Sequence, residues 1–239
     1  MKRFLAPLVF AALTGISGTV ALAQSAEAPV VVELFTSQGC SSCPPADAYL
    51  GTLTDREDVI ALSLHVDYWD YLGWRDLFGS PAHTQRQRNY AAVMRERMVY
   101  TPQIVVQGAK HVVGSHKEEV EDAIAASAEI PAAATVSLRL KDDLLIAEIS
   151  PKQTTQRQRG RVLMAWYTDA ERVKIQRGEN RGSDFTYHNV VKGWSELGTW
   201  DGARQTVTAP KPMAADGVAI LIQSNDGGPI MAAAKMALD

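Results

Sequence analysis

The chain has 239 residues, and its 24 Lys and Arg residues stand against 27 Asp and Glu residues, a formal net charge of −3. It has no basic excess that would draw it onto nucleic acid or anionic lipid, so neither partner is predicted. The length suffices for one large or two modest domains with buried cores, and we expect two.

The N-terminal segment 1–23 has the three parts of a secretory signal peptide: a basic start, an apolar stretch and a small-x-small cleavage site that ends at Ala23. No later segment approaches membrane-spanning length. We therefore expect cleavage after Ala23, no stable membrane insertion afterwards, and a periplasmic or secreted protein. An uncleaved N-terminal anchor is the alternative.

A predicted buried strand, Val30–Phe35, leads into the only two cysteines of the chain, Cys40 and Cys43. Two prolines directly after Cys43 fit the first turn of a helix that runs to about Leu53. Cys40 should therefore lie at a helix N-terminus, where the thiolate is stabilised and the pKa of its thiol is lowered. Cys43 is close enough to form a disulfide with Cys40, and an oxidising compartment permits one.

A second buried strand, Val59–Val66, follows and suggests parallel pairing with the first. After an aromatic, glycine-punctuated segment, 67–80, a helix is predicted from Pro81 to about Met98. We expect its arginines to form a solvated face, which is the usual arrangement of such charges: Arg86, Arg88, Arg95 and Arg97.

The next predicted strand, Gln103–Gln107, is preceded by Thr101-Pro102 and turns back through a hairpin into 111–114. Ser115-x-x-Glu118 is a capping box that predicts a helix to about Ser127. The order of elements is then β-α-β-α-β-β-α.

This order, with Cys-x-x-Cys after the first strand and Thr-Pro before the third, resembles the thioredoxin superfamily. The resemblance implies that Pro102 is cis and faces the cysteine pair. It also implies that Cys40 is the attacking thiol and Cys43 the resolving thiol, while Thr101 offers its backbone to a partner chain. The dipeptide between the cysteines is Ser-Ser, rather than the Gly-Pro or Pro-His of better-known oxidoreductases.

Five blocks spread over the mature chain look like a closer family of secreted bacterial thioredoxin-like proteins, known only as a domain of unknown function. The blocks are FTSQGCSSCPPAD, HVDYWDYLGW, TQRQRNYA, YTPQIVV, and GENRG followed by YHNVV. The resemblance implies fold and export, and it carries no established reaction.

Beyond a linker at 130–134, short predicted strands replace the α/β pattern: 135–140, 144–150, 161–168, 172–177, 185–193, 206–209, 218–224 and 230–237. We therefore predict an α/β fold, in which a thioredoxin-like domain with a helical insertion, 28–129, precedes a small antiparallel β-sandwich-like domain, 133–239. The polar segment 178–189 is interpreted as a long hairpin loop, and folding of that loop over the cysteine face is the alternative.

The leading functional hypothesis is an extracytoplasmic thiol-disulfide oxidoreductase that uses Cys40 and Cys43, with Thr101 and Pro102 orienting protein thiols or disulfides as partners. It requires no cofactor, and no particular oligomeric state is predicted. The first alternative is a soft-metal module that binds Cu(I) through Cys40, Cys43 and His65. The second is a non-catalytic binding or assembly protein in which the disulfide is structural.

Overall fold

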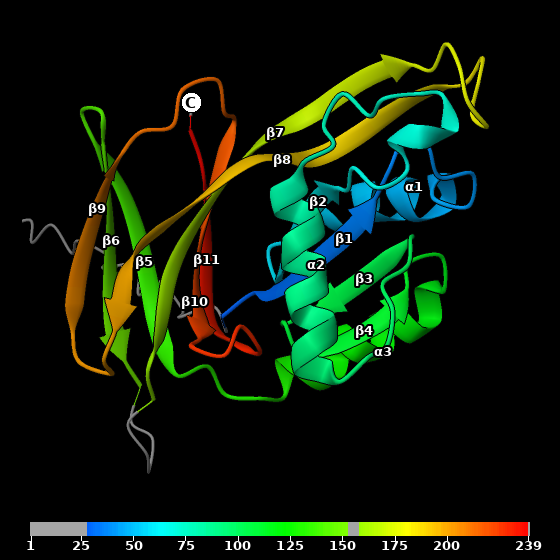
Figure 1. Ribbon diagram of the computed structural model, residues 1–239. Helices are drawn as coiled ribbons and strands as arrows, with labels where there is room; N and C mark the ends of the chain where they lie inside the picture. The colour runs from blue at the N-terminus through cyan, green and yellow to red at the C-terminus, as the bar shows by residue number, and fades with distance from the viewer. Residues whose placement is uncertain (1–27, 153–157, 239) are drawn as a thin grey trace, which may run out of the picture.

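The structure is a computed structural model that describes residues 28–152 and 158–238, so the predicted signal peptide lies outside the described residues. Three α-helices, a short 3-10 helix and eleven strands follow one another in these ranges (Figure 1). Their bounds are β1 Val30–Thr36, α1 Pro44–Leu53, β2 Val59–His65, η1 Asp70–Leu72, α2 Pro81–Met94, β3 Gln103–Val106, β4 Lys110–Val113, α3 Lys117–Ala128, β5 Ala134–Lys141, β6 Leu144–Pro151, β7 Gly160–Lys174, β8 Asp184–Trp200, β9 Gln205–Pro210, β10 Gly217–Ser224 and β11 Ile230–Ala237.

The first half is built on β1, which is buried along its whole length. β1 pairs in parallel with β2, as predicted, and antiparallel with β3. Alternate residues of β1 face opposite sides of the sheet. Val32 and Leu34 pack with α1 and α3, whereas Val31 and Phe35 pack with Tyr90 of α2. Helices therefore cover both faces of this part of the sheet.

The predicted fold class is wrong, because the strands of the second half do not form a separate sandwich. Four of them, β7, β8, β10 and β11, continue the sheet of the first half. That sheet has eight strands in the order β11-β10-β7-β8-β2-β1-β3-β4, while β5, β6 and β9 form a second sheet. The junction is a parallel bridge between Ser63 of β2 and Val190 of β8. Strands account for 45% of the described residues and helices for 19%, so this part of the protein is mostly β rather than a thioredoxin-like α/β fold with a helical insertion.

The length of β7 and β8 explains this difference. The predicted strands 161–168 and 172–177 merge into the 15-residue β7, and β8 extends to 17 residues. Alternate residues of β7 pack into two different hydrophobic cores. Val162 and Met164 face the three-stranded sheet, while Leu163 and Ala165 join the core that also contains Phe35. Such a strand belongs to both halves. Whether segments 28–129 and 133–239 fold as separate domains stays a prediction.

Three local expectations also need correction. Helix α2 ends at Met94 rather than near Met98, because Arg95 adopts a left-handed conformation with φ 60° and caps the helix with its backbone N–H. Helix α3 begins after His116 without a side-chain cap, so the predicted capping box at Ser115 does not form. Arg86 is not solvated, since it makes a two-pronged ion pair with the buried carboxylate of Glu33.

Across the ranges described, no helix is both long enough and apolar enough to cross a membrane.

Candidate functional site

The disulfide predicted between Cys40 and Cys43 is present, with an S–S distance of 2.09 Å and a Cα–Cα distance of 5.4 Å. It lies in the loop between β1 and α1. Cys43, not Cys40, is the N-cap residue of α1, and Pro44 occupies the first turn as predicted. Cys40 lies just before the helix, where its backbone N–H donates to the Ser37 carbonyl oxygen at 3.1 Å. The predicted lowering of the Cys40 thiol pKa stays a prediction for the reduced pair.

The two cysteines differ in how far solvent reaches them. Cys43 is fully buried, while Cys40 is 4% exposed and is flanked by the exposed residues Ser41 and Ser42. The Ser42 hydroxyl lies 3.5 Å from Cys40 Sγ. Both cysteines are buried, and Cys40 is the less buried of the two.

Thr101 and Pro102 lie next to this loop. Their peptide bond is cis, and Pro102 is buried at the start of β3, which pairs with β1 in a register that sets Gln103 opposite Phe35. A side-chain carbon at Gly114 would approach both Pro102 Cβ at 3.3 Å and Ala46 Cβ of α1 at 3.0 Å. Pro102 therefore packs near the first turn of α1.

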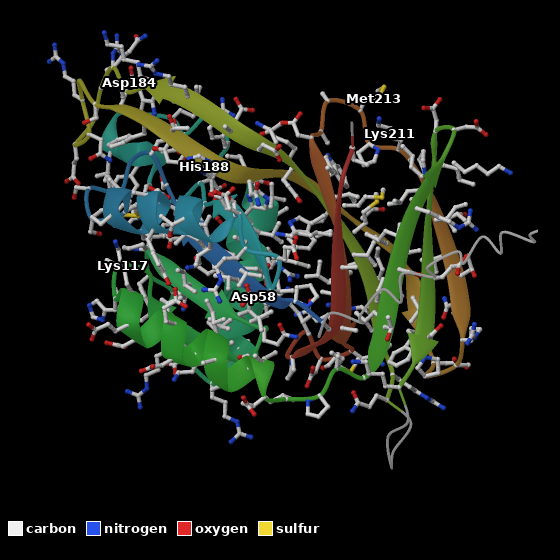
Figure 2. All side chains as sticks on the ribbon, turned by 180° about the vertical axis from the view of Figure 1, so that it is seen from behind. Asp58, Lys117, Asp184, His188, Lys211 and Met213 are labelled. Carbon is white, nitrogen blue, oxygen red and sulfur yellow. A yellow bond between two sulfur atoms is a disulfide. The ribbon has the colours of Figure 1, made fainter. Side chains whose placement is uncertain are left out.

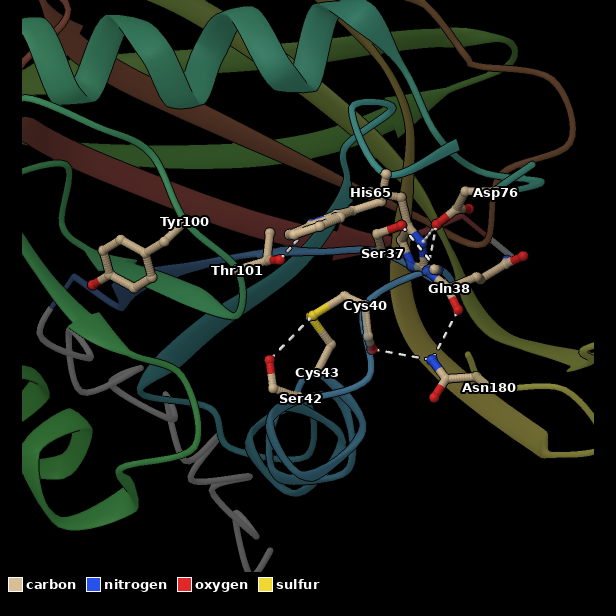
Figure 3. The surroundings of a disulfide bond; sticks show 12 residues. Ser37, Gln38, Cys40, Ser42, Cys43, His65, Asp76, Tyr100, Thr101 and Asn180 are labelled. Atoms are coloured by element: carbon tan, nitrogen blue, oxygen red, sulfur yellow. Dashed lines mark hydrogen bonds and ion pairs between the residues drawn. A yellow bond between two sulfur atoms is a disulfide. The ribbon is translucent and has the colours of Figure 1, made fainter. Parts of the chain in front are cut away.

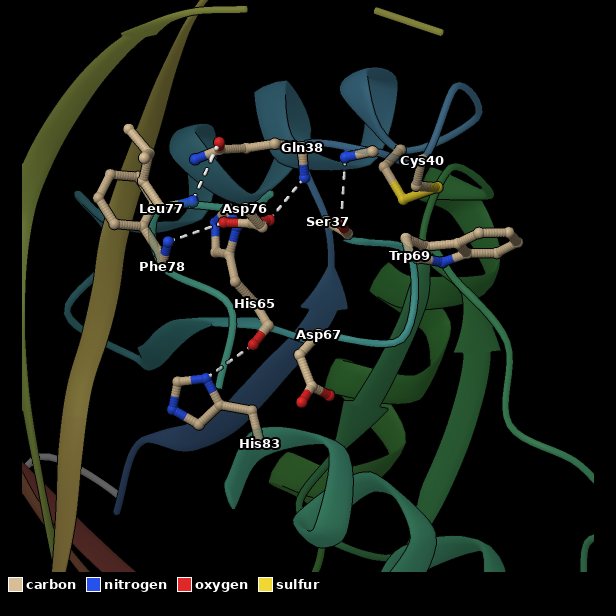
Figure 4. A network of polar contacts seen from close by, with 12 residues as sticks. Ser37, Gln38, Cys40, His65, Asp67, Trp69, Asp76, Leu77, Phe78 and His83 are labelled. Carbon is tan, nitrogen blue, oxygen red and sulfur yellow. Dashed lines mark hydrogen bonds and ion pairs between the residues drawn. A yellow bond between two sulfur atoms is a disulfide. The ribbon is translucent and has the colours of Figure 1, made fainter. Parts of the chain in front are cut away.

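Trp69 completes this side of the site. Its indole Nε1 donates to Thr101 Oγ1 at 2.8 Å, and its Cβ lies 3.2 Å from where a side chain at Gly39 would begin. A side chain at position 39, immediately before Cys40, would therefore crowd Trp69. Figure 4 shows the Trp69 ring beside the disulfide, and Figure 3 shows Thr101 on the same side of Cys40.

His65 is not a free site residue, because it belongs to a buried polar network that holds the cysteine loop. Its Nδ1 lies 2.8 Å from Asp76 Oδ2, which also accepts the backbone N–H of Gln38 at 2.7 Å (Figure 4). Burial alone would raise the pKa of Asp76, but the charge and hydrogen bond of His65 and the backbone hydrogen bonds of Gln38 and Phe78 lower it. Asp76 is thus a buried carboxylate.

Asp47 is a buried carboxyl group of α1, one helical turn after Cys43. Burial raises its pKa from 3.8 to about 7, an effect that the nearby His65 opposes. Two further buried polar atoms on this side of the sheet make no hydrogen bond within the described part of the chain: Ser63 Oγ and His65 Nε2. Such atoms are costly unless a proton or water satisfies them.

The tip of the β7–β8 hairpin forms the other side of the site, as the alternative interpretation of segment 178–189 expected. The side-chain amide of Asn180 donates from Nδ2 to the carbonyl oxygens of Gln38 at 2.9 Å and Cys40 at 3.0 Å. Figure 3 shows Asn180 and Thr101 on two sides of Cys40. The tip is therefore bound to the cysteine loop.

Sequence reasoning missed Asp47 and Asp76. A signal existed for Asp47, because it follows Cys43 by four positions and precedes Leu50 by three, which places it on the buried face of α1. No comparable signal existed for Asp76, which lies in an irregular aromatic segment.

The alternative metal set of Cys40, Cys43 and His65 gains no support. Within residues 28–152 and 158–238, no group of three or more His, Cys, Asp or Glu side chains is arranged to hold a metal ion. The Nδ1 atom of His65 is also engaged by Asp76.

The fold and the site define a mostly β protein in which one large mixed sheet carries a Cys-x-x-Cys disulfide at the start of a helix. Residues 31–223 match the family described as "Protein of unknown function (DUF1223)", and the chain belongs to that family. No match was found among curated proteins.

Two solved structures are similar. An Agrobacterium tumefaciens protein, whose crystal structure comes from a structural genomics consortium, is 34% identical with a TM-score of 0.77, and the match covers 89% of this chain and 96% of that one. HBP35 of Porphyromonas gingivalis is 16% identical with a TM-score of 0.58, over 89% of this chain and 76% of that one, which is a likeness of fold alone.

Proposed function

We propose that this protein is an extracytoplasmic thiol-disulfide oxidoreductase, located in the periplasm or secreted, whose reactive group is the Cys40–Cys43 disulfide. The observation that carries the proposal is the arrangement around Cys40. Cys40 is the less buried residue of the pair, Thr101 lies near it, and Pro102 packs near the first turn of the adjoining helix (Figure 3). A relation to the thioredoxin superfamily is part of this proposal and rests on that local arrangement only.

The oxidised pair would accept electrons from a partner that carries two thiols. A partner thiolate attacks Cys40 Sγ, the Cys40–Cys43 bond breaks, and Cys43 leaves as a thiolate with the electron pair. The second partner thiolate then attacks the partner's sulfur in the mixed disulfide and releases Cys40 as a thiolate. The partner gains a disulfide, and the two protons that its thiols lost are returned to Cys40 and Cys43. The reverse sequence reduces a partner disulfide.

Asp47 is suited to proton transfer in this sequence. A carboxyl group with a pKa of about 7 changes its protonation at neutral pH, and Asp47 lies one helical turn after the buried Cys43. Since Cys43 has no exposed surface, the proton for its thiolate must come through the protein interior or after the loop opens. Asp47 would supply or accept that proton.

Thr101 would bind the partner chain. Thr101 is half-buried and its side-chain oxygen is held by Trp69, so its backbone would be the part that pairs with an extended segment. The partners are therefore proteins whose reactive cysteine lies in an extended, accessible stretch.

Insulin reduction and refolding of reduced ribonuclease, each measured over a range of glutathione potentials, test this function. Turnover that requires both Cys40 and Cys43 is the expected result. A protein without turnover at any potential, whose Cys40→Ser and Cys43→Ser variants lose only stability, has a structural disulfide instead.

A further inference from the structure

A basic surface lies next to the cysteine loop, defined by the exposed residues Arg75, Arg177 and Arg181. Arg75 follows η1, whereas the other two lie in the β7–β8 tip. The two segments touch, because a side-chain carbon at Gly178 would lie 3.2 Å from Trp74 Cβ. Figure 2 shows nitrogen-ended side chains gathered at this corner, around the labelled Asp184.

These three arginines are unpaired in the part of the chain that the structure describes. Other charged side chains on the same hairpin are already engaged. Arg172 pairs with Asp184 at 2.8 Å, and Lys192 pairs with Glu171 at 2.7 Å. The remaining charges of the tip are Lys174 and a single carboxylate, that of Glu179.

The excess positive charge lies on a segment that is hydrogen-bonded to the cysteine loop. The chain as a whole is acidic, with a formal net charge of −3, so a cluster of free guanidinium groups is not an effect of overall composition. Asn180 lies between Arg177 and Arg181 and is hydrogen-bonded to the Cys40 carbonyl oxygen. The positive charge is therefore attached directly to the loop that carries the disulfide.

We propose that this basic surface binds acidic residues next to the reactive cysteine of the partner polypeptide. The inference rests on the proposed function and adds the chemistry of its partner. Guanidinium groups bind carboxylates through paired N–H donors, and such charge complementarity also speeds encounter.

The surface fits an extended chain better than a small anion. Its arginines come from two segments, and an aromatic pair adjoins the Arg75 segment, since the ring of Tyr71, which is 77% exposed, stacks on Trp69 at a centroid distance of 6.3 Å. A partner segment with acidic residues and an apolar side chain would contact both features at once.

Binding is measured by fluorescence anisotropy with the full oxidised protein and labelled ten-residue peptides that carry serine in place of cysteine. Three peptides differ only in their flanks, which are acidic, neutral amide or basic. At low salt the acidic peptide should bind about tenfold more tightly than the neutral one, the order expected for two exposed charge pairs, and 0.5 M NaCl should abolish the difference.

Charge-reversal variants locate the effect. Arg177→Glu with Arg181→Glu should remove the preference for the acidic peptide. The control, Arg139→Glu with Lys141→Glu on exposed positions of β5, changes the net charge equally and should keep the preference, although it also breaks the exposed ion pair of Arg139 with Glu148. Arg75→Glu, in a separate segment, should weaken acidic-peptide binding independently.

An acidic preference that persists in the Arg177/Arg181 variant, or that the β5 control removes equally, overturns the proposal. So does equal binding of the three peptides. Because these peptides contain no cysteine, their binding tests the surface even if the protein exchanges no disulfide. Disulfide exchange with a neutral cysteine-containing peptide tests the proposed function separately.

A competition experiment tests whether the surface binds a polypeptide or any small anion, with glutathione disulfide as the small anionic competitor. Displacement of the peptide by millimolar glutathione disulfide contradicts recognition of a polypeptide.

Discussion

Asn180 Nδ2 donates a hydrogen bond to the Cys40 carbonyl oxygen at 3.0 Å, across 140 positions of the chain. This contact joins the end of the long β7–β8 hairpin to the loop that carries the disulfide. The second half of the protein therefore takes part in the site, through the tip of the hairpin that β7 and β8 form.

Replacement of Asn180 by Ala should loosen the cysteine loop. Two carbonyl oxygens, those of Gln38 and Cys40, would lose their donor, and each such loss costs about 0.5–1.5 kcal/mol. We expect the free energy of unfolding in urea to fall by about 1–2 kcal/mol and dithiothreitol to reduce the disulfide faster. The neighbouring exposed Glu179→Ala is the control. Unchanged reduction kinetics in Asn180→Ala would mean that the hairpin tip does not restrain the loop.

Asp47 should make stability depend on pH. Burial, its largest influence, raises the folded-state pKa of Asp47 from 3.8 to about 7, so the folded protein holds a proton that the unfolded chain releases. Its contribution to stability is therefore present below pH 4 and is lost as pH rises through 7. Asp47→Asn should flatten the profile and raise the free energy of unfolding at pH 8 by on the order of 1–4 kcal/mol.

Urea unfolding between pH 4 and pH 8 checks this expectation, with exposed Asp122→Asn on α3 as the matched control. A variant with the same pH slope as the parent protein would show that Asp47 is not the group that titrates.

Removal of one partner of the buried Glu33–Arg86 ion pair should destabilise the fold more than removal of both partners. Arg86 also stacks on Trp194 at 4.2 Å and donates to Gln223 at 3.1 Å, so it ties α2 to strands of both halves. Arg86→Leu should lower the free energy of unfolding by about 3–5 kcal/mol, because it leaves the Glu33 carboxylate uncompensated. The double variant Glu33→Leu with Arg86→Leu should be more stable than Arg86→Leu alone. Equal stability of the two would refute the electrostatic explanation.

Local elements were predictable from the sequence, because each depends on neighbouring residues. The buried strand at 30–36, the proline-initiated helix after Cys43 and the Thr101-Pro102 step into β3 all lie where their patterns indicate. The disulfide follows from the spacing of the only two cysteines. These local patterns therefore predicted the strand, the helix and the disulfide that make up the cysteine loop and its surroundings.

The overall fold was not predictable in the same way. The polar residues Asp169 and Glu171 fall in the predicted break between strands 161–168 and 172–177, but they belong to the continuous β7, where Asp169 is exposed and Glu171 half-buried. A pattern of alternation cannot reveal which strands pair, and the Ser63–Val190 bridge that joins the halves connects residues that are far apart in the sequence. The contacts of Asp76 and Asn180 depend on the same long-range pairing. The sequence gave no sign of the Asp76 contact, and it offered the folding of segment 178–189 over the cysteine face only as an alternative.

Trapping of a mixed disulfide tests the central claim most directly. The Cys43→Ser variant, incubated with an exported protein that contains an accessible disulfide, should accumulate a covalent complex through Cys40, visible by non-reducing electrophoresis and located by mass spectrometry of the joined peptides. Cys40→Ser should form little or none. No complex with Cys43→Ser, or equal amounts with both variants, would contradict the assignment of Cys40 as the reactive sulfur.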